Sequence, residues 1–196
     1  MRNDFTFFSG LNFTCRLPFN ERIIIIMNAF LLIVPIFIVR YAYVALRAKQ
    51  KLKLLNYFPA PKGVEKHGKT VYLIINTYLL FAPLFMEFSV GNEISIPGCT
   101  FYGLGLIMYI KAIHDFISVD GLVMHGIYSF SRNPQALSFI LIYTGISMLT
   151  NSILYMSLVC VLVWAFNEMA KSEERFCKLE FGDPYILYTK FTRRFL

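Results

Sequence analysis

The sequence predicts an all-α integral membrane protein with about five transmembrane helices, forming a single domain over residues 1–196. Apolar residues make up 57% of the chain and charged residues 16%, whereas a typical soluble domain has roughly 45–50% and about 25%. Twenty Phe and twelve Tyr are more than one small water-soluble core can enclose. The composition excludes a disordered chain, which requires low hydrophobicity, and argues against a soluble globular protein.

Five apolar segments are predicted to be helices, because a span needs about 20 residues and flanking residues can complete the shorter ones. The first is interrupted only by Asn28 and Pro35, and no small-residue cleavage site follows it, so we expect an uncleaved helix rather than a signal peptide. The third contains Gly103 and Gly105, which suit close helix contact. The segments are 23–39, 71–88, 100–113, 136–149 and 152–166.

The last two segments are separated only by Thr150 and Asn151. They therefore predict a tight antiparallel helical hairpin over residues 136–166. At 1.5 Å per residue, about fifteen residues in each direction return the chain to the face that it left. Arg132 precedes the hairpin and Glu173 follows it, so we expect these two side chains to meet at one membrane depth.

The distribution of basic residues predicts the orientation. Of the nineteen Lys and Arg residues, three lie before the first segment, and sixteen lie in 40–70, 111–134 and 168–196. The positive-inside rule places these sixteen in the cytoplasm, with the N-terminus outside and a cytoplasmic C-terminal segment. The same rule accounts for the net charge of +7 without nucleic acid as a partner. The four cysteines lack zinc or redox spacing, so we expect no metal site and no disulfide framework.

Polar residues concentrate in two cytoplasmic stretches, 122–134 and 173–188, which the hairpin makes neighbours. In the first, Gly126 permits close backbone approach to a ligand, and Pro134 can begin a helix, where its missing N–H costs nothing. Tyr128 offers a flat apolar face with a polar tip. In the second, the adjacent carboxylates of Glu173 and Glu174 would repel each other unless a cation lies between them.

These two stretches resemble the isoprenylcysteine carboxyl methyltransferase family. The similar pattern is Leu-Val-x-x-Gly-Ile-Tyr-x-x-x-Arg-(His/Asn)-Pro, then a helical hairpin, Glu-Glu, and Phe-Gly-x-x-Tyr-x-x-Tyr, over residues 119–191. That family belongs to a wider group of membrane methyltransferases that includes phospholipid N-methyltransferases. The resemblance implies S-adenosylmethionine as cofactor, an active site at the cytoplasmic membrane face, and a lipid-like or prenylated acceptor that enters from the bilayer.

By position, the resemblance implies that Arg132 and Glu174 act in catalysis and that the motif residues line the cofactor pocket. The cofactor has a sulfonium, an ammonium and a carboxylate, so Glu can bind its cations and Arg its carboxylate. Methyl transfer is a direct displacement, and the main task of the site is to align donor and acceptor. The expected cofactor residues are Leu122, Val123, His125, Gly126, Tyr128, Arg132, Asn133, Pro134, Glu173 and Glu174.

Three departures from the family pattern bear on the acceptor. Asn133 stands where many members have His, as in phospholipid methyltransferases, and Ala136 replaces a common aromatic residue. Met169 stands where carboxyl-methylating members carry Arg, and Lys171 could replace that cation only as a point charge. The expected partners are membrane lipids and an amphiphilic acceptor, with no obligate protein partner evident.

The alternatives to a carboxyl methyltransferase are a phospholipid amine N-methyltransferase, an NADPH-dependent membrane sterol-type reductase, and a non-catalytic membrane protein. The reductases share an Arg-His-Pro-like motif, but they usually have more helices than this chain can hold. In a non-catalytic protein, the two polar stretches would only brace the hairpin.

Overall fold

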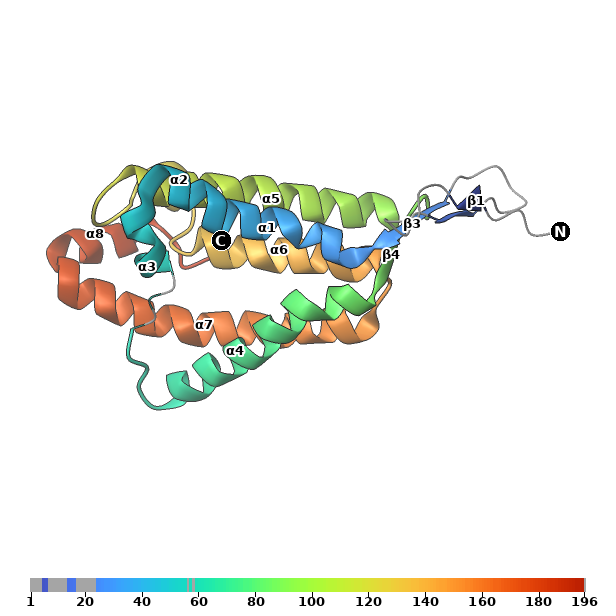
Figure 1. Ribbon diagram of the computed structural model, residues 1–196. Coiled ribbons are helices and arrows are strands. Elements are labelled where there is room, and N and C mark those ends of the chain that lie inside the picture. Colours follow the sequence, from blue (N-terminus) through green and yellow to red (C-terminus); the bar gives the residue numbers. More distant parts are fainter. Residues whose placement is uncertain (1–4, 7–13, 17–23, 56, 58, 196) are drawn as a thin grey trace.

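The computed structural model describes residues 5–6, 14–16, 24–55, 57 and 59–195. Helices dominate the described chain and run side by side along one long axis (Figure 1). Within this part, four helical stretches are long and apolar enough to cross a membrane: Ala29–Leu55, Val64–Phe85, Ser95–Ser118 and Ile153–Phe181. A fifth apolar helix, Pro134–Leu149, is shorter. The prediction of an all-α membrane protein is confirmed.

The first helical stretch differs from the prediction at both ends. Ile24–Asn28 is a strand (β3), as befits a run of β-branched Ile residues, and the helix begins at Ala29, where the Asn28 side chain accepts a hydrogen bond from Phe30 N at 2.9 Å. The stretch then continues to Leu55 rather than ending near residue 39. It changes geometry along its length, from the 3-10 turn η1 (Ala29–Leu32) through α1 (Val34–Phe37), the π-helical segment η2 (Ile38–Tyr43), α2 (Val44–Ala48) and η3 (Lys49–Lys51) to α3 (Leu52–Leu55).

The second helix is shifted towards the N-terminus relative to the prediction. Helix α4 covers Val64–Phe81 and passes into a 3-10 turn, η4 (Ala82–Phe85). Pro83 accounts for the change, because it has no N–H to donate to the carbonyl of Leu79. The hydroxyl of Tyr155 donates to that carbonyl instead, at 2.7 Å. The chain then forms a strand, β4 (Glu87–Val90), where the sequence predicted more helix.

A small antiparallel sheet lies at one end of the helices, in the order β1 (Phe5–Thr6), β2 (Thr14–Arg16), β3, β4. The sequence did not predict it, because its residues fall in or beside runs that also suit a buried helix. The N-terminal stretch whose Arg2 and Arg22 entered the charge count lies outside the described residues, apart from the short strands.

Helices α5 (Ser95–Ser118) and α6 (Pro134–Leu149) pack against each other through glycine. A Cβ on Gly105 would lie 2.8 Å from the backbone nitrogen of Ile142, and one on Gly145 would lie 2.5 Å from that of Tyr102. The prediction for Gly105 is therefore confirmed. The prediction for Gly103 is wrong, because nothing lies within 4 Å of the position that its Cβ would take.

The predicted helical hairpin is present, formed by α6 and α7 (Ile153–Phe181). Its turn is tight, with Asn151 at a φ of 49°. Helix α7 is 29 residues long, or about 43 Å at 1.5 Å per residue, whereas the hydrocarbon core is about 30 Å thick. Its last turns, which carry Glu173 and Glu174, lie at the end of the molecule opposite the sheet (Figure 1).

A further helix, α8 (Asp183–Phe191), follows α7 after Gly182, whose φ is 58°. It lies with α2 and α3 at the same end as the last turns of α7 (Figure 1). In the core between the helices, the Tyr143 hydroxyl donates to the Asn76 side chain at 3.0 Å. This is the kind of interhelical hydrogen bond expected of a polar residue in the middle of a span.

Candidate active site

A cavity of about 400 Å³ opens at the end of the helices that carries α8. This size is within the range of small-molecule sites. Its wall is rich in aromatic residues and includes parts of the first helical stretch, of residues 121–136 and of helices α7 and α8. The aromatic residues that line it are Tyr57, Tyr72, Phe116, Tyr128, Phe139, Phe166, Phe176, Phe181, Tyr185 and Tyr188.

Most of the predicted cofactor residues line this cavity. They are Leu122, Val123, Tyr128, Arg132, Asn133, Pro134, Glu173 and Glu174. His125 and Gly126 are absent from its lining. Residues 122–134 and the end of α7 are therefore brought together, as the hairpin predicted.

Gly126 has a different neighbour from the one expected. Its φ is +61°, and a Cβ there would collide with the carboxylate of Asp115 rather than with a ligand. That carboxylate accepts a hydrogen bond from Ile127 N at 2.8 Å, which fastens residues 126–129 to the end of α5. His125 lies beside it with an exposed side chain, 3.3 Å from the Ser118 hydroxyl. Both residues shape the loop whose later part lines the cavity.

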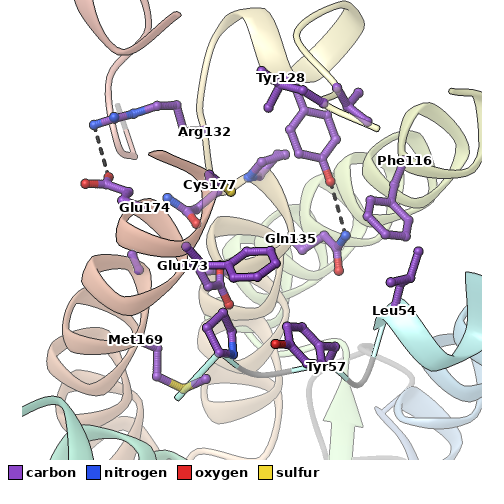
Figure 2. Close-up of a pocket in the computed structure, with 18 of the residues that line it drawn as sticks. Leu54, Tyr57, Phe116, Tyr128, Arg132, Gln135, Met169, Glu173, Glu174 and Cys177 are labelled. Atoms are coloured by element: carbon purple, nitrogen blue, oxygen red, sulfur yellow. Dashed lines mark hydrogen bonds and ion pairs between the residues drawn. The ribbon is translucent and has the colours of Figure 1, made fainter. Parts of the chain in front are cut away.

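Tyr128 is held at both ends. Its hydroxyl accepts a hydrogen bond from the Gln135 amide at 3.1 Å, as Figure 2 shows, and its carbonyl accepts one from the hydroxyl of Tyr188 at 2.5 Å. Burial raises the pKa of Tyr188 to about 12, so its phenol stays protonated and remains a donor at neutral pH. The aromatic face of Tyr128 is thereby fixed in the cavity wall.

Arg132, Glu174 and Arg194 form one ion cluster at the cavity wall. Nη2 of Arg132 lies 3.1 Å from Oε1 of Glu174. Arg194 contacts both oxygens of that carboxylate, through Nε at 2.8 Å and Nη2 at 2.9 Å. The three side chains are 12%, 11% and 31% exposed. Nε of Arg132 is buried, and within the described part of the chain it has no hydrogen-bond partner.

Glu173 faces another direction. From the sequence we expected Arg132 to meet Glu173, but the structure pairs Arg132 with Glu174. Adjacent residues on a helix point about 100° apart. In Figure 2, Glu174 points to Arg132, whereas Glu173 points towards the part of the cavity where Tyr57 lies. No residue among those described here forms an ion pair or hydrogen bond with the Glu173 carboxylate, which lines the cavity.

The segment after α8 belongs to the site, although the sequence did not predict this. The carbonyl of Arg193 accepts a hydrogen bond from Arg132 N at 2.9 Å, and the carbonyl of Arg194 accepts one from the Asn133 amide at 3.1 Å. This segment therefore lies along residues 131–133 and brings the Arg194 side chain to Glu174. The only signal was a pair of adjacent arginines, which resembles the basic residues common at membrane surfaces.

Arg40 was also missed. It lies in η2, within the first membrane-spanning stretch, and lines the cavity. Its Nη2 donates to the carbonyl of Leu55 at 2.7 Å, and its Nη1 lies 3.5 Å from the Tyr109 hydroxyl. A lone Arg inside an apolar helix is a signal of function, because a charge in the membrane is costly. We had instead counted Arg40 as the start of a cytoplasmic basic loop.

The structure also shows where Met169 and the two basic residues after it in sequence, Lys171 and Arg175, lie. Met169 lines the cavity. Lys171 lies 2.5 Å from Oε1 of Glu168, and Arg175 donates to both oxygens of Glu65, at 2.5 and 2.7 Å. Neither Lys171 nor Arg175 lines the cavity.

Comparison with known proteins agrees with this geometry. Residues 98–183 match the family model described as phospholipid methyltransferase. This segment runs from α5 to the start of α8 and contains every site residue predicted from the sequence. No curated protein matches the chain. The match confirms the resemblance to the membrane methyltransferases and supports a methyltransferase in the membrane. Over residues 98–183, the chain is therefore similar to the phospholipid methyltransferase family.

Proposed function

We propose that this protein transfers a methyl group from S-adenosylmethionine to the amine of an amphiphilic phospholipid. The observation that supports this most directly is the presence of two unsatisfied, oppositely charged groups in one cavity of the matched domain. These are Nε of Arg132, which is buried without a described partner, and the carboxylate of Glu173.

The residues of the cavity fit the methyl donor. Nε of Arg132 is suited to the donor's carboxylate, since charge-assisted hydrogen bonds are the strong ones in proteins. The aromatic wall suits the adenine ring and the sulfonium, which can lie against ring faces. When bound, the cofactor supplies an electrophilic methyl group whose bond to sulfur breaks as the bond to the acceptor forms, with the electron pair returning to sulfur.

The charges in the cavity favour an amine acceptor over a prenylcysteine carboxylate. Met169 is uncharged, and the two basic residues nearest it in sequence are engaged by Glu168 and Glu65 outside the cavity. Glu173 offers a negative charge for an ammonium group, and Arg40, which also lines the cavity, carries a positive charge that would attract a phosphate. A zwitterionic ethanolamine-type headgroup carries both of these groups.

Glu173 can also handle the proton. An amine with a pKa near 10, like that of Lys, is protonated at neutral pH and must lose a proton before its lone pair can attack. A carboxylate without an ion-pair partner can accept that proton, directly or through water. Glu174 is less suited to this step, because two hydrogen bonds from Arg194 and an ion pair with Arg132 occupy its oxygens.

The proposed location of the site is the cytoplasmic membrane face. The cavity lies at the end of the helices where residues 119–133, α3 and α8 gather. These regions belong to the sixteen-residue basic set that the positive-inside rule places in the cytoplasm. Membrane lipids would then supply the acceptor by lateral diffusion.

The test uses the full chain in lipid nanodiscs. We expect S-adenosylhomocysteine to bind by calorimetry, and labelled methyl groups to be transferred to a phosphatidylethanolamine with a higher kcat/KM than to a prenylated cysteine. Turnover of the prenylated cysteine alone would refute the amine assignment. Thermal stabilisation by NADPH, with none by S-adenosylhomocysteine, would favour the reductase and overturn the proposal as a whole.

A further inference from the structure

We propose that Arg194 is a positioning residue of the cofactor site, which holds the Glu174 carboxylate so that Nε of Arg132 stays available for an anionic ligand. This inference rests on the proposed function, because it assigns that ligand as the carboxylate of the methyl donor. Arg194 lies outside the segment that matches the family model.

The contacts of Arg194 fix the Glu174 carboxylate at both oxygens. Its Nε and Nη2 contact Oε1 and Oε2 at 2.8 and 2.9 Å, which is a bidentate pair. Its Nη1 donates to the Asn167 side chain at 2.9 Å, and this third contact anchors the guanidinium two turns earlier on α7. Bidentate pairing adds geometric specificity as well as energy, so Arg194 determines which way the carboxylate faces.

The pairing with Arg132 is weaker as a consequence. Nη2 of Arg132 lies 3.1 Å from Oε1, an oxygen that Arg194 Nε already contacts at the shorter distance of 2.8 Å. Nε of Arg132 is therefore left without a partner in the described structure. A buried donor without a hydrogen bond is costly, and a ligand oxygen that accepts from it removes that cost.

The charge of the cluster favours the same ligand. Two guanidinium groups share one carboxylate, so the three side chains carry one excess positive charge in a largely buried place. Glu173 does not cancel it by contact, since it points to another part of the cavity. An anionic group beside Arg132 would balance the charge.

Removal of Arg194 changes the way Arg132 pairs with Glu174. Without the bidentate contact, the Glu174 carboxylate can turn to Arg132 and pair with both Nε and Nη2, as isolated Arg–carboxylate pairs often do. Nε would then be occupied by the protein. The expected effect is a loss of affinity for ligands that carry a carboxylate, but not for ligands that lack one.

Calorimetry on the full chain in nanodiscs tests this with two ligands. S-adenosylhomocysteine carries the amino-acid carboxylate, and 5′-methylthioadenosine has the same adenosine and thioether without it. We expect Arg194→Gln to lower the affinity for S-adenosylhomocysteine by about tenfold or more, which is the scale of one charge-assisted hydrogen bond. The affinity for methylthioadenosine should stay within about twofold of the wild-type value. Arg194→Lys keeps the charge without the fork, and we expect it to lie between wild type and Arg194→Gln.

The matched control is Arg193→Gln. Arg193 has an exposed side chain and contributes its backbone carbonyl to Arg132, so this variant removes the same charge from the neighbouring position. It should bind both ligands like the wild type. In a Glu174→Gln background, Arg194→Gln should have little further effect on S-adenosylhomocysteine, because the two residues act as one unit.

Three outcomes overturn the inference. Unchanged S-adenosylhomocysteine affinity in Arg194→Gln would show that Arg194 does not prepare the site. Equal losses for both ligands, or an equal loss in Arg193→Gln, would indicate a general structural or electrostatic effect. If the wild-type protein binds neither ligand, the proposed function fails first; if it binds both and the variants do not discriminate, only the role of Arg194 fails.

Discussion

Replacing Glu173 or Glu174 with Gln, one at a time, distinguishes the roles of the two adjacent carboxylates, because the two side chains have different surroundings. The substitution is the same in both variants and removes charge while keeping size. Glu174 lies between Arg132 and Arg194, with three contacts between 2.8 and 3.1 Å. Glu173 has no ion-pair partner among the described residues and faces the cavity.

The expected magnitudes follow from these contacts. Removing one partner of a buried ion pair costs about 3–5 kcal/mol, and we expect the lower end of that range for Glu174→Gln because Arg194 is 31% exposed. We expect Glu173→Gln to change the free energy of unfolding by less than about 0.5 kcal/mol, since no described contact is lost. It should instead slow transfer to an amine lipid by about 100-fold or more, since a general base usually contributes about 10²- to 10⁴-fold.

Both effects are measurable on nanodisc-embedded protein. Thermal unfolding gives stability, and transfer of a labelled methyl group at saturating donor and lipid gives kcat. We expect a lowered unfolding temperature for Glu174→Gln, and a near-native unfolding temperature with reduced kcat for Glu173→Gln. A stability loss in Glu173→Gln as large as that in Glu174→Gln would refute the assignment of the two carboxylates, as would full activity in Glu173→Gln.

Four further substitutions test other parts of the structure. Gly126→Ala should destabilise the protein by roughly 1–3 kcal/mol, since it places a Cβ at positive φ against a carboxylate, whereas Gly103→Ala, which meets open space, should be neutral in thermal unfolding. Tyr155→Phe leaves the Leu79 carbonyl without its donor and should cost about 1–2 kcal/mol; an unchanged unfolding temperature would argue that another group satisfies that carbonyl. Met169→Arg places a cation in the cavity wall and should lower kcat/KM for an amine lipid by about tenfold or more, and an assay that finds amine turnover unchanged would contradict the proposed acceptor.

The sequence by itself predicted the class of the protein and eight of the residues that line its cavity. Apolar content and segment lengths indicate membrane helices because no soluble core of this size can enclose so many apolar side chains. The short turn at Thr150 and Asn151 placed residues 122–134 beside the end of α7, and the structure confirms it. Chain connectivity alone determines this juxtaposition, so no tertiary information was needed.

Helix boundaries and local geometry were harder to predict from the sequence. The Ile-rich run before Asn28 fits a helix or a strand equally well by hydrophobicity, and only pairing with residues 87–90 decides for the strand. The reason for glycine at position 126 was similarly undetermined, since a glycine indicates only that some group lies close to the backbone and does not identify that group. In the structure that neighbour is Asp115.

The roles within the ion cluster were decided by tertiary structure alone. The sequence shows two adjacent glutamates and one arginine, but the rotation of α7 determines that Glu174 meets Arg132 while Glu173 faces the cavity. Arg194 and Arg40 reach the site from distant parts of the chain. Side-chain direction depends on how helices rotate and pack against one another, and a single sequence encodes this only through contacts that form when the chain folds.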